Sequence, residues 1–274
     1  MKLFLSVDME GITGLGDDTF VDSRKLNYER GRRLMTDEAN HVIAEAFDQG
    51  CKDVIVNDSH SKMNNLMIER LHPDAKLITG DVKPFSMVQC LDDTYTGAMF
   101  IGYHARASMK GVMSHSMIFG VRHFYINDIE VGELGFNAYV AGYYKVPVLM
   151  VAGDDKAALE AEQLIPNVTT AVVKETISRS SVLSLTPEQS GKLLKEKTAE
   201  AIKNRNSVQP LIPPDHPLLT IEFANYGQAE WAALMPGTEI ISGTTKVKFQ
   251  AENIIDAYKA MLVMTELAMH TAFC

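Results

Sequence analysis

Short apolar runs alternate with longer amphipathic segments along most of the chain. Six runs have the length of a β-strand, at residues 3–7, 53–57, 75–78, 97–102, 147–152 and 168–173. Apolar residues at helical spacing lie between these runs, at residues 22–50, 132–142 and 156–164. Strands that alternate with helices in this way form mainly parallel sheets with helices on both faces. The pattern therefore predicts an α/β fold, a three-layer αβα arrangement around a mainly parallel sheet.

The pattern changes after a charged amphipathic helix expected at residues 186–203. A proline-rich segment, residues 209–217, comes next, and the rest of the chain predicts a strand, a short helix, two strands and a long final helix. We therefore expect an α/β catalytic domain at residues 1–210 and a smaller α+β domain at residues 211–274. The wide apolar face of the final helix predicts packing on a sheet and contacts with a neighbouring subunit.

A β-hairpin is expected at residues 112–126, with His115 in its first strand. A helix of small and apolar residues follows, and Glu133 lies in its first turn. The helix dipole favours an acid in the first turn, and a histidine in a strand can simply pack against its neighbours. Both residues therefore have an ordinary structural explanation as well as a possible role in a site.

Polar residues follow three of the predicted strands. Asp8 and Glu10 come after the first run, His60 after the second, and His104 after the run at residues 97–102. Alternate side chains of a strand share a face, so Asp8 and Glu10 are expected to project to the same side. The carboxyl ends of parallel strands meet at the edge where α/β proteins bind ligands. We therefore predict that these four side chains lie together, within reach of Glu133.

Mixed carboxylate and imidazole ligands are typical of zinc sites. If one carboxylate bridges, five ligands can give each of two ions three protein contacts and leave a position for water. Asp8 is the natural bridge. Aminopeptidases and phosphatases both use such ion pairs, so these residues alone do not choose the reaction. A metal-dependent phosphoesterase with Ser59 as nucleophile and a non-catalytic peptide-binding accessory of a transport system remain alternatives.

Composition argues against several classes of protein. The 274 residues include 26 basic and 35 acidic side chains, a formal net charge of −9, whereas nucleic-acid binding needs clustered basic residues. The three cysteines, Cys51, Cys90 and Cys274, are widely spaced and favour neither a disulfide framework nor a thiolate zinc site. No apolar run has the length of a signal-peptide core or a membrane span. We expect a cytoplasmic protein that binds neither nucleic acid nor membrane.

Four sequence motifs contain most of the candidate residues. They are S-V-D-M-E-G at 6–11, V-N-D-S-H-S-K-M-N-N-L at 56–66, G-Y-H-A-R-A at 102–107 and G-V-M-S-H-S-M-I-F-G-V-R at 111–122. Together they closely resemble the DppA family of zinc-dependent D-aminopeptidases, which is associated with dipeptide permease operons of bacilli. The resemblance covers essentially the whole chain, to the final Phe273-Cys274. It implies two zinc ions per subunit, with these residues as ligands: Asp8 as the bridge, Glu10 and His60 on one ion, and His104 and Glu133 on the other.

The same resemblance implies an activity and an assembly. Members of the family remove D-amino acids such as D-alanine from the amino ends of short peptides, and they form a homodecamer around an internal chamber. The implied partners are therefore short D-amino-acid peptides and other copies of this chain. For His115, the family suggests a catalytic role as nucleophile or base. We favour acid/base chemistry, because a neutral imidazole can take a proton from water and return it to the leaving amine.

Overall fold

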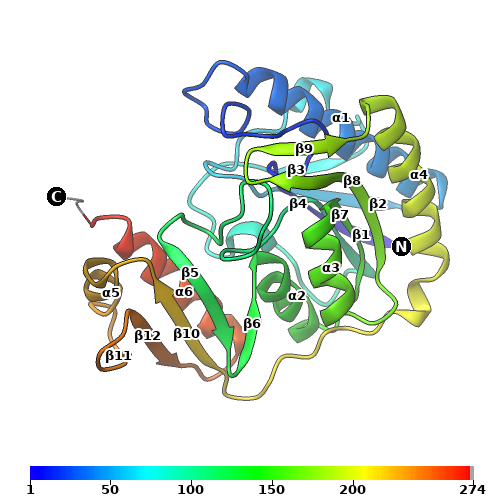
Figure 1. The fold of residues 1–274 in the computed structure, drawn as a ribbon. Coiled ribbons are helices and arrows are strands. Elements are labelled where there is room, and N and C mark those ends of the chain that lie inside the picture. Colours follow the sequence, from blue (N-terminus) through cyan, green and yellow to red (C-terminus); the bar gives the residue numbers. More distant parts are fainter. Residues whose placement is uncertain (272–274) are drawn as a thin grey trace.

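A seven-stranded sheet forms the centre of the computed structural model, which describes residues 1–271 (Figure 1). In spatial order its strands are β3 (Lys76–Ile78), β2 (Asp53–Asp58), β1 (Lys2–Val7), β4 (Gly97–Tyr103), β7 (Val148–Asp154), β8 (Thr169–Ser178) and β9 (Ser181–Ser184). The first six are parallel, and β9 pairs with β8 in the antiparallel direction. The predicted mainly parallel sheet is therefore confirmed.

Helices cover both faces of this sheet. Helices α1 (Tyr28–Asp48) and α4 (Pro187–Lys203) contact each other, with α1 on β1 and β2 and α4 on β7 and β8. Helices α2 (Glu133–Tyr143) and α3 (Asp155–Leu164) also contact each other, and they lie on β4 and on β7 and β8. Short 3-10 helices occur at Ile68–Arg70, Ser86–Val88 and Arg205–Ser207. The three-layer αβα arrangement expected from the hydrophobic pattern is present.

A second, antiparallel sheet lies beside α2 (Figure 1). In spatial order its strands are β11 (Thr238–Ile240), β12 (Lys246–Gln250), β10 (Leu218–Phe223), β5 (Val121–Ile126) and β6 (Ile129–Val131). Helices α5 (Tyr226–Ala232) and α6 (Ile254–Ala268) contact β10 and β12. Because β5 and β6 precede residue 210, this sheet takes strands from both sides of the expected domain boundary. The division at residues 210 and 211 stays a prediction.

The structure corrects the hairpin that was expected at residues 112–126. Only its second half is a strand, β5, which pairs with β6 and β10. Residues 112–120 form a loop instead, and Met113 and Met117 adopt positive φ angles of 46° and 62° that interrupt extended structure. His115 therefore lies in a loop. The apolar composition of this segment reflects burial rather than sheet pairing, since Val112 and Met113 are buried.

Two other element boundaries differ from the expectation. The first long helix begins at Tyr28 rather than after Asp22-Ser23, because Asp22 instead closes a turn with Arg24 through an ion pair of 2.9 Å. Strand β8 extends well beyond residue 173 and turns into β9. Most side chains of this hairpin after Lys174 are exposed or half-buried and many are polar, so the hydrophobic pattern did not reveal it.

Two further expectations concern the cysteines and membrane-spanning segments. Cys51 and Cys90 are free thiols, whereas Cys274 lies outside the described residues. Within residues 1–271, no helix combines the length and apolar character needed to cross a membrane.

Candidate metal centre

The candidate residues meet at the carboxyl edge of the large sheet. Asp8 follows β1, His60 lies two residues beyond β2, and His104 directly follows β4. The strand order β2-β1-β4 places these three strand ends next to one another. Glu133 is the first residue of α2 and reaches the same cluster from the helix layer.

Glu10 reaches the cluster by a turn, not by the strand alternation expected from the sequence. Strand β1 ends at Val7, and the chain then bends so that Gly11 N donates a hydrogen bond to Gly102 O at 2.7 Å. The approach is close, since a Cβ at Gly11 would lie 2.0 Å from the Tyr103 carbonyl oxygen. This bend directs the Glu10 carboxylate back toward Asp8 and the histidines.

Two groups of side chains can be distinguished within the cluster. In the first, His60 Nδ1 lies 3.0 Å from Glu10 Oε2 and 3.5 Å from Asp8 Oδ1. In the second, His104 Nε2 lies 3.5 Å from Asp8 Oδ2 and 3.6 Å from Glu133 Oε2. We call these groups the first and the second subsite. The two oxygens of Asp8 face different histidines, as a bridging carboxylate requires.

Two carboxylate oxygens at the centre of the cluster have no hydrogen-bond partner. They are Asp8 Oδ2 and Glu10 Oε2, and both are buried, although buried polar atoms are almost always satisfied. Within the described residues, Asp8, Glu10 and His104 offer ligand atoms within 4.8 Å of one another, as do His104, His115 and Glu133. The unpaired oxygens, the spacing and the mixture of imidazole and carboxylate donors fit zinc.

Main-chain carbonyls set the tautomer of each histidine. His60 Nε2 lies 2.8 Å from Val21 O, and His104 Nδ1 lies 2.9 Å from Ala105 O. A carbonyl oxygen can only accept, so these ring nitrogens carry the proton. The other nitrogen of each ring faces the carboxylates, where its lone pair can bind either a second proton or a cation. Hydrogen bonds of this kind commonly orient metal-binding histidines.

The charges of the cluster shift the pKa values of its members in opposite directions. Burial raises the pKa of Asp8 to about 7, and the charge of Glu10 adds to this shift. Burial also acts to raise the pKa of Glu10, but attraction to His60 holds it well below its usual range. Burial acts to lower the pKa values of His60 and His104, yet Glu10 and Glu133 respectively raise them well above 6.5. The centre therefore favours bound positive charge, whether as protons or as a cation.

His115 lies between the two subsites. Its Nε2 is 3.9 Å from both Glu10 Oε1 and Glu133 Oε1, and its ring stacks on His104 with centroids 4.5 Å apart. Its Nδ1 donates to Met113 O at 2.9 Å, so the lone pair of Nε2 faces the cluster. Burial lowers the pKa of His115, and the neighbouring His104 contributes. Distance alone does not separate a ligand role from proton transfer, so the assignment of His115 stays a prediction.

Comparison with known proteins identifies the family. A model of the M55 peptidase family, described as D-aminopeptidase, matches residues 1–263. This chain belongs to the M55 family of D-aminopeptidases. A D-aminopeptidase of Bacillus subtilis (strain 168) is 74% identical over 274 residues, which are 100% of each chain. The resemblance found in the sequence motifs is thereby confirmed.

A solved structure has nearly the same fold as this chain. It is the Zn-dependent D-aminopeptidase DppA from Bacillus subtilis, described as a self-compartmentalizing protease. The two chains are 74% identical, each is covered completely, and the TM-score is 0.99. This match supports the same three-layer architecture in the present family member.

Two acids that the sequence analysis did not single out hold the backbone beside the second subsite. Asp154 Oδ2 accepts a hydrogen bond of 3.0 Å from Ala105 N, directly after His104. Glu160 Oε1 accepts one of 2.7 Å from Gly132 N, directly before Glu133. Both acids are buried. Asp154 could have been found because it lies at the end of a strand, whereas nothing in the sequence around Glu160 indicates its contact with Gly132.

Ser59, the nucleophile of the phosphoesterase alternative, and the two arginines of the neighbouring sequence motifs are engaged elsewhere in this D-aminopeptidase family member. The Ser59 hydroxyl is buried and lies 2.8 Å from Ser6 Oγ, in a hydrogen-bond network that includes none of the candidate metal ligands. Arg106 forms an ion pair with Glu130, and Arg122 donates to a main-chain carbonyl at 3.2 Å. Of the residues that the structure describes, Ser59 is therefore not a free nucleophile, and Arg106 and Arg122 are not free to bind a phosphate group.

Proposed function

We propose that this protein is a zinc-dependent D-aminopeptidase that uses two metal ions per subunit. The observation that carries the proposal is the position of Asp8, whose two carboxylate oxygens face the histidines of different subsites. Glu10 and His60 would complete the first subsite, and His104 and Glu133 the second. Each ion would then have three protein ligands and an open position, as catalytic zinc sites require.

Bound zinc at these positions would lower the pKa of a water molecule and polarise the peptide carbonyl group. The chain itself supplies the proton carrier. We assign His115 as general base and then general acid, because its Nε2 lone pair faces the carboxylates and its lowered pKa keeps the ring neutral near pH 7. It can take a proton from water and return it to the departing amine. We prefer this route to a covalent acyl-histidine.

We propose short peptides with an amino-terminal D-residue of the D-alanine type as substrates. The relatives' description as D-aminopeptidases supports this choice.

We also propose that the chain assembles into a large homo-oligomer, a decamer, with contacts on the smaller α+β unit at residues 211–274. The solved relative is described as self-compartmentalizing. The apolar face of α6 packs on β10 and β12, as expected, and most of it is buried, including Ile254, Tyr258 and Met261, so little of it is left for a neighbouring subunit. Apolar side chains around α5 offer a surface instead, since Trp231 and Leu234 are 41% and 65% exposed. Light scattering should give a mass of several subunits, and an active monomer would contradict the assembly.

We place the enzyme in the cytoplasm. The free thiols of Cys51 and Cys90 are compatible with a reducing compartment. Fractionation of the source cells should recover the activity with the cytoplasmic proteins, and recovery in the secreted fraction would contradict this location.

Zinc content and stereospecific hydrolysis, measured on one preparation, test the proposed activity. Metal analysis should find two zinc ions per subunit, and D-Ala-D-Ala should be hydrolysed with a kcat/KM far above that of L-Ala-L-Ala. Equal rates on the two epimers would leave a general dizinc aminopeptidase. A preparation that hydrolyses a chromogenic phosphate monoester but no peptide would restore the phosphoesterase alternative.

A further inference from the structure

The segment that carries Asp8 and Glu10 has no regular secondary structure to hold it. It leaves β1 after Val7, and the next regular element is α1, which begins at Tyr28. We call residues 8–16 of this segment the ligand loop. Because two carboxylates of the metal centre lie on it, the geometry of the first subsite depends on how the ligand loop is anchored.

Lys174 anchors the ligand loop from the sheet. Its side chain lies on β8 and is 1% exposed. The ammonium group donates to the carbonyl oxygens of Glu10, Ile12 and Leu15, the last two at 2.9 and 2.7 Å. These three bonds use all the donors of a lysine. Burial lowers the pKa of Lys174 to about 8, so the group is charged at neutral pH.

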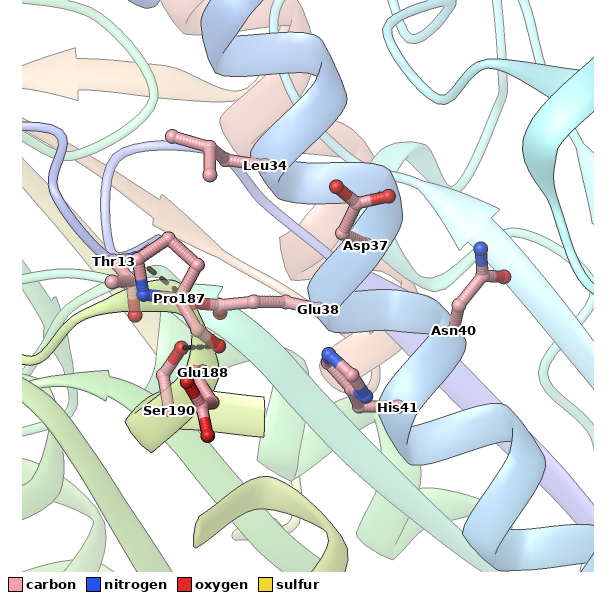
Figure 2. A pocket seen from close by; sticks show the side chains of 9 residues that line it. All are labelled: Thr13, Leu34, Asp37, Glu38, Asn40, His41, Pro187, Glu188 and Ser190. Carbon is pink, nitrogen blue, oxygen red and sulfur yellow. Dashed lines mark hydrogen bonds between the residues drawn. The ribbon is translucent and has the colours of Figure 1, made fainter. Parts of the chain in front are cut away.

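Glu38 anchors the same loop from the helix layer. Its Oε1 accepts a hydrogen bond of 3.0 Å from Thr13 N, and the side chain is 4% exposed. Figure 2 shows the carboxylate extending from α1 toward Thr13, at the wall of a pocket of about 360 Å³ that also includes Pro187 and Ser190 of α4. Burial raises the pKa of Glu38, and the charge of Lys174 counteracts this shift.

The two anchors therefore bind the loop in complementary ways: the ammonium group of Lys174 donates hydrogen bonds to it, and the carboxyl group of Glu38 accepts one from it. Carbonyl oxygens of the loop turn toward Lys174, while the N–H group of Thr13 turns toward Glu38. We propose that Lys174 and Glu38 are positioning residues that clamp the ligand loop and so set the geometry of the first subsite. This inference rests on the proposed zinc-dependent function.

Removal of the clamp should weaken zinc binding at the first subsite and leave the second subsite intact. Lys174 acts on the main chain at Glu10 itself, so its loss frees a ligand of the first subsite. His104 and Glu133 are held by other groups and keep their places. Loss of a residue that orients a metal ligand commonly weakens metal binding roughly 10- to 100-fold. Only one of the two zinc-binding constants, that of the first subsite, should change by this amount.

The decisive experiment compares single and double variants of the intact assembled protein. Lys174→Met or Glu38→Met alone leaves an uncompensated buried charge and should lower the Tm. The double variant Lys174→Met/Glu38→Met removes both charges and should recover much of the Tm. A purely structural pair would then recover its zinc as well. The clamp predicts that the double variant still binds the first-subsite zinc roughly 10- to 100-fold more weakly, in chelator-buffered titrations.

Three further variants sharpen the test. Glu38→Gln keeps an oxygen acceptor for Thr13 N and should keep both zinc ions. Lys192→Met changes an exposed lysine whose side chain is 77% accessible and should behave as wild type. Adding His60→Ala to the double variant should abolish the weakened zinc binding and leave the other binding constant unchanged, because both changes act on the first subsite. This last result would assign the weakened ion to that subsite.

The possible outcomes distinguish failure of the clamp from failure of the proposed function. A zinc-replete wild type and a double variant with the same two binding constants would overturn the clamp and leave the proposed function intact. Loss of zinc from Glu38→Gln equal to that from Glu38→Met would also overturn it, because the acceptor oxygen would not matter. A wild-type protein without zinc would contradict the proposed function itself. If neither Met variant folds, loss of a zinc ion from Glu38→Gln would still contradict the clamp, because this variant keeps the oxygen acceptor for Thr13 N.

Discussion

The metal ligands and His115 occupy one cluster, yet they are supported in different ways. Main chain next to the ligands is bonded to buried charged side chains. Lys174 bonds Glu10 O, Asp154 accepts from Ala105 N beside His104, and Lys83 donates to Asp58 O at 2.5 Å, two residues before His60. All three of these charged groups are buried. The positions of the ligands are therefore part of the folded core.

The first part of the His115 loop, residues 112–120, is bonded to an exposed neighbour. Met113 N donates to Arg179 O at 2.8 Å, and Arg179 Nη1 donates to Ser114 O at 2.6 Å. Arg179 lies in the turn between β8 and β9 and is exposed. Phe119 packs on the His115 ring with centroids 4.9 Å apart, although it is itself 72% exposed.

This contrast matches the different requirements of metal binding and proton transfer. Groups that hold a metal gain from a rigid core, because binding to a preorganised site costs little reorganisation. A proton carrier must meet the water and then the leaving amine, so a loop with exposed support suits it better. Changes to the ligands should therefore alter metal content and stability together, whereas changes around His115 should alter turnover alone.

Asp8→Ala should have the largest effect. It removes the proposed bridge, so both zinc ions should bind weakly, activity should be lost, and the Tm should fall in the presence of zinc because metal binding stabilises the folded state. Metal analysis and thermal unfolding test this. In excess chelator the difference in Tm should shrink, since Asp8 is a buried carboxylate repelled by Glu10. A variant that kept two zinc ions would contradict the bridge.

His115→Ala should separate turnover from metal binding. The variant should keep both zinc ions and a nearly unchanged Tm, while kcat falls by roughly two to four orders of magnitude, the usual contribution of a positioned acid/base group. His104→Ala is the matched control on the adjacent ring and should lose one zinc. The opposite pattern, in which His115→Ala loses a zinc and His104→Ala keeps two, would make His115 a ligand.

The same contrast explains which parts of the site could be predicted from the sequence. His60 and His104 were found because each follows an apolar run, and the ends of neighbouring parallel strands must meet. Glu10 was expected from strand alternation, but it arrives through a turn held by Lys174, a residue 164 positions away. Hydrogen bonds over such separations leave no periodic signal, so neither Lys174 nor Glu38 could be identified.

The loop of His115 was predicted as a strand for a related reason. Its residues have the apolar character of a strand, yet its backbone groups bond to distant partners. His115 N donates to Ala105 O at 3.3 Å, and Met117 N donates to Glu133 Oε1 at 2.6 Å. Tertiary contacts of this kind outweigh local β-propensity. Fold class follows from the hydrophobic pattern, whereas the conformation of a site loop depends on partners that only the folded chain brings near.

Arg179→Met should have the smallest effect and gives the finest test of the comparison. It removes the side-chain bonds to Ser114 but leaves His115 in place, so kcat should fall about tenfold, below the roughly hundredfold that a 1 Å misplacement can cost. Zinc content and Tm should stay at wild-type values, because Arg179 is exposed and far along the chain from every ligand. Arg179→Lys keeps a positively charged donor group and should recover part of the loss. A wild-type kcat in Arg179→Met would show that the loop needs no exposed support, and a loss of zinc would show that the two regions are not independent.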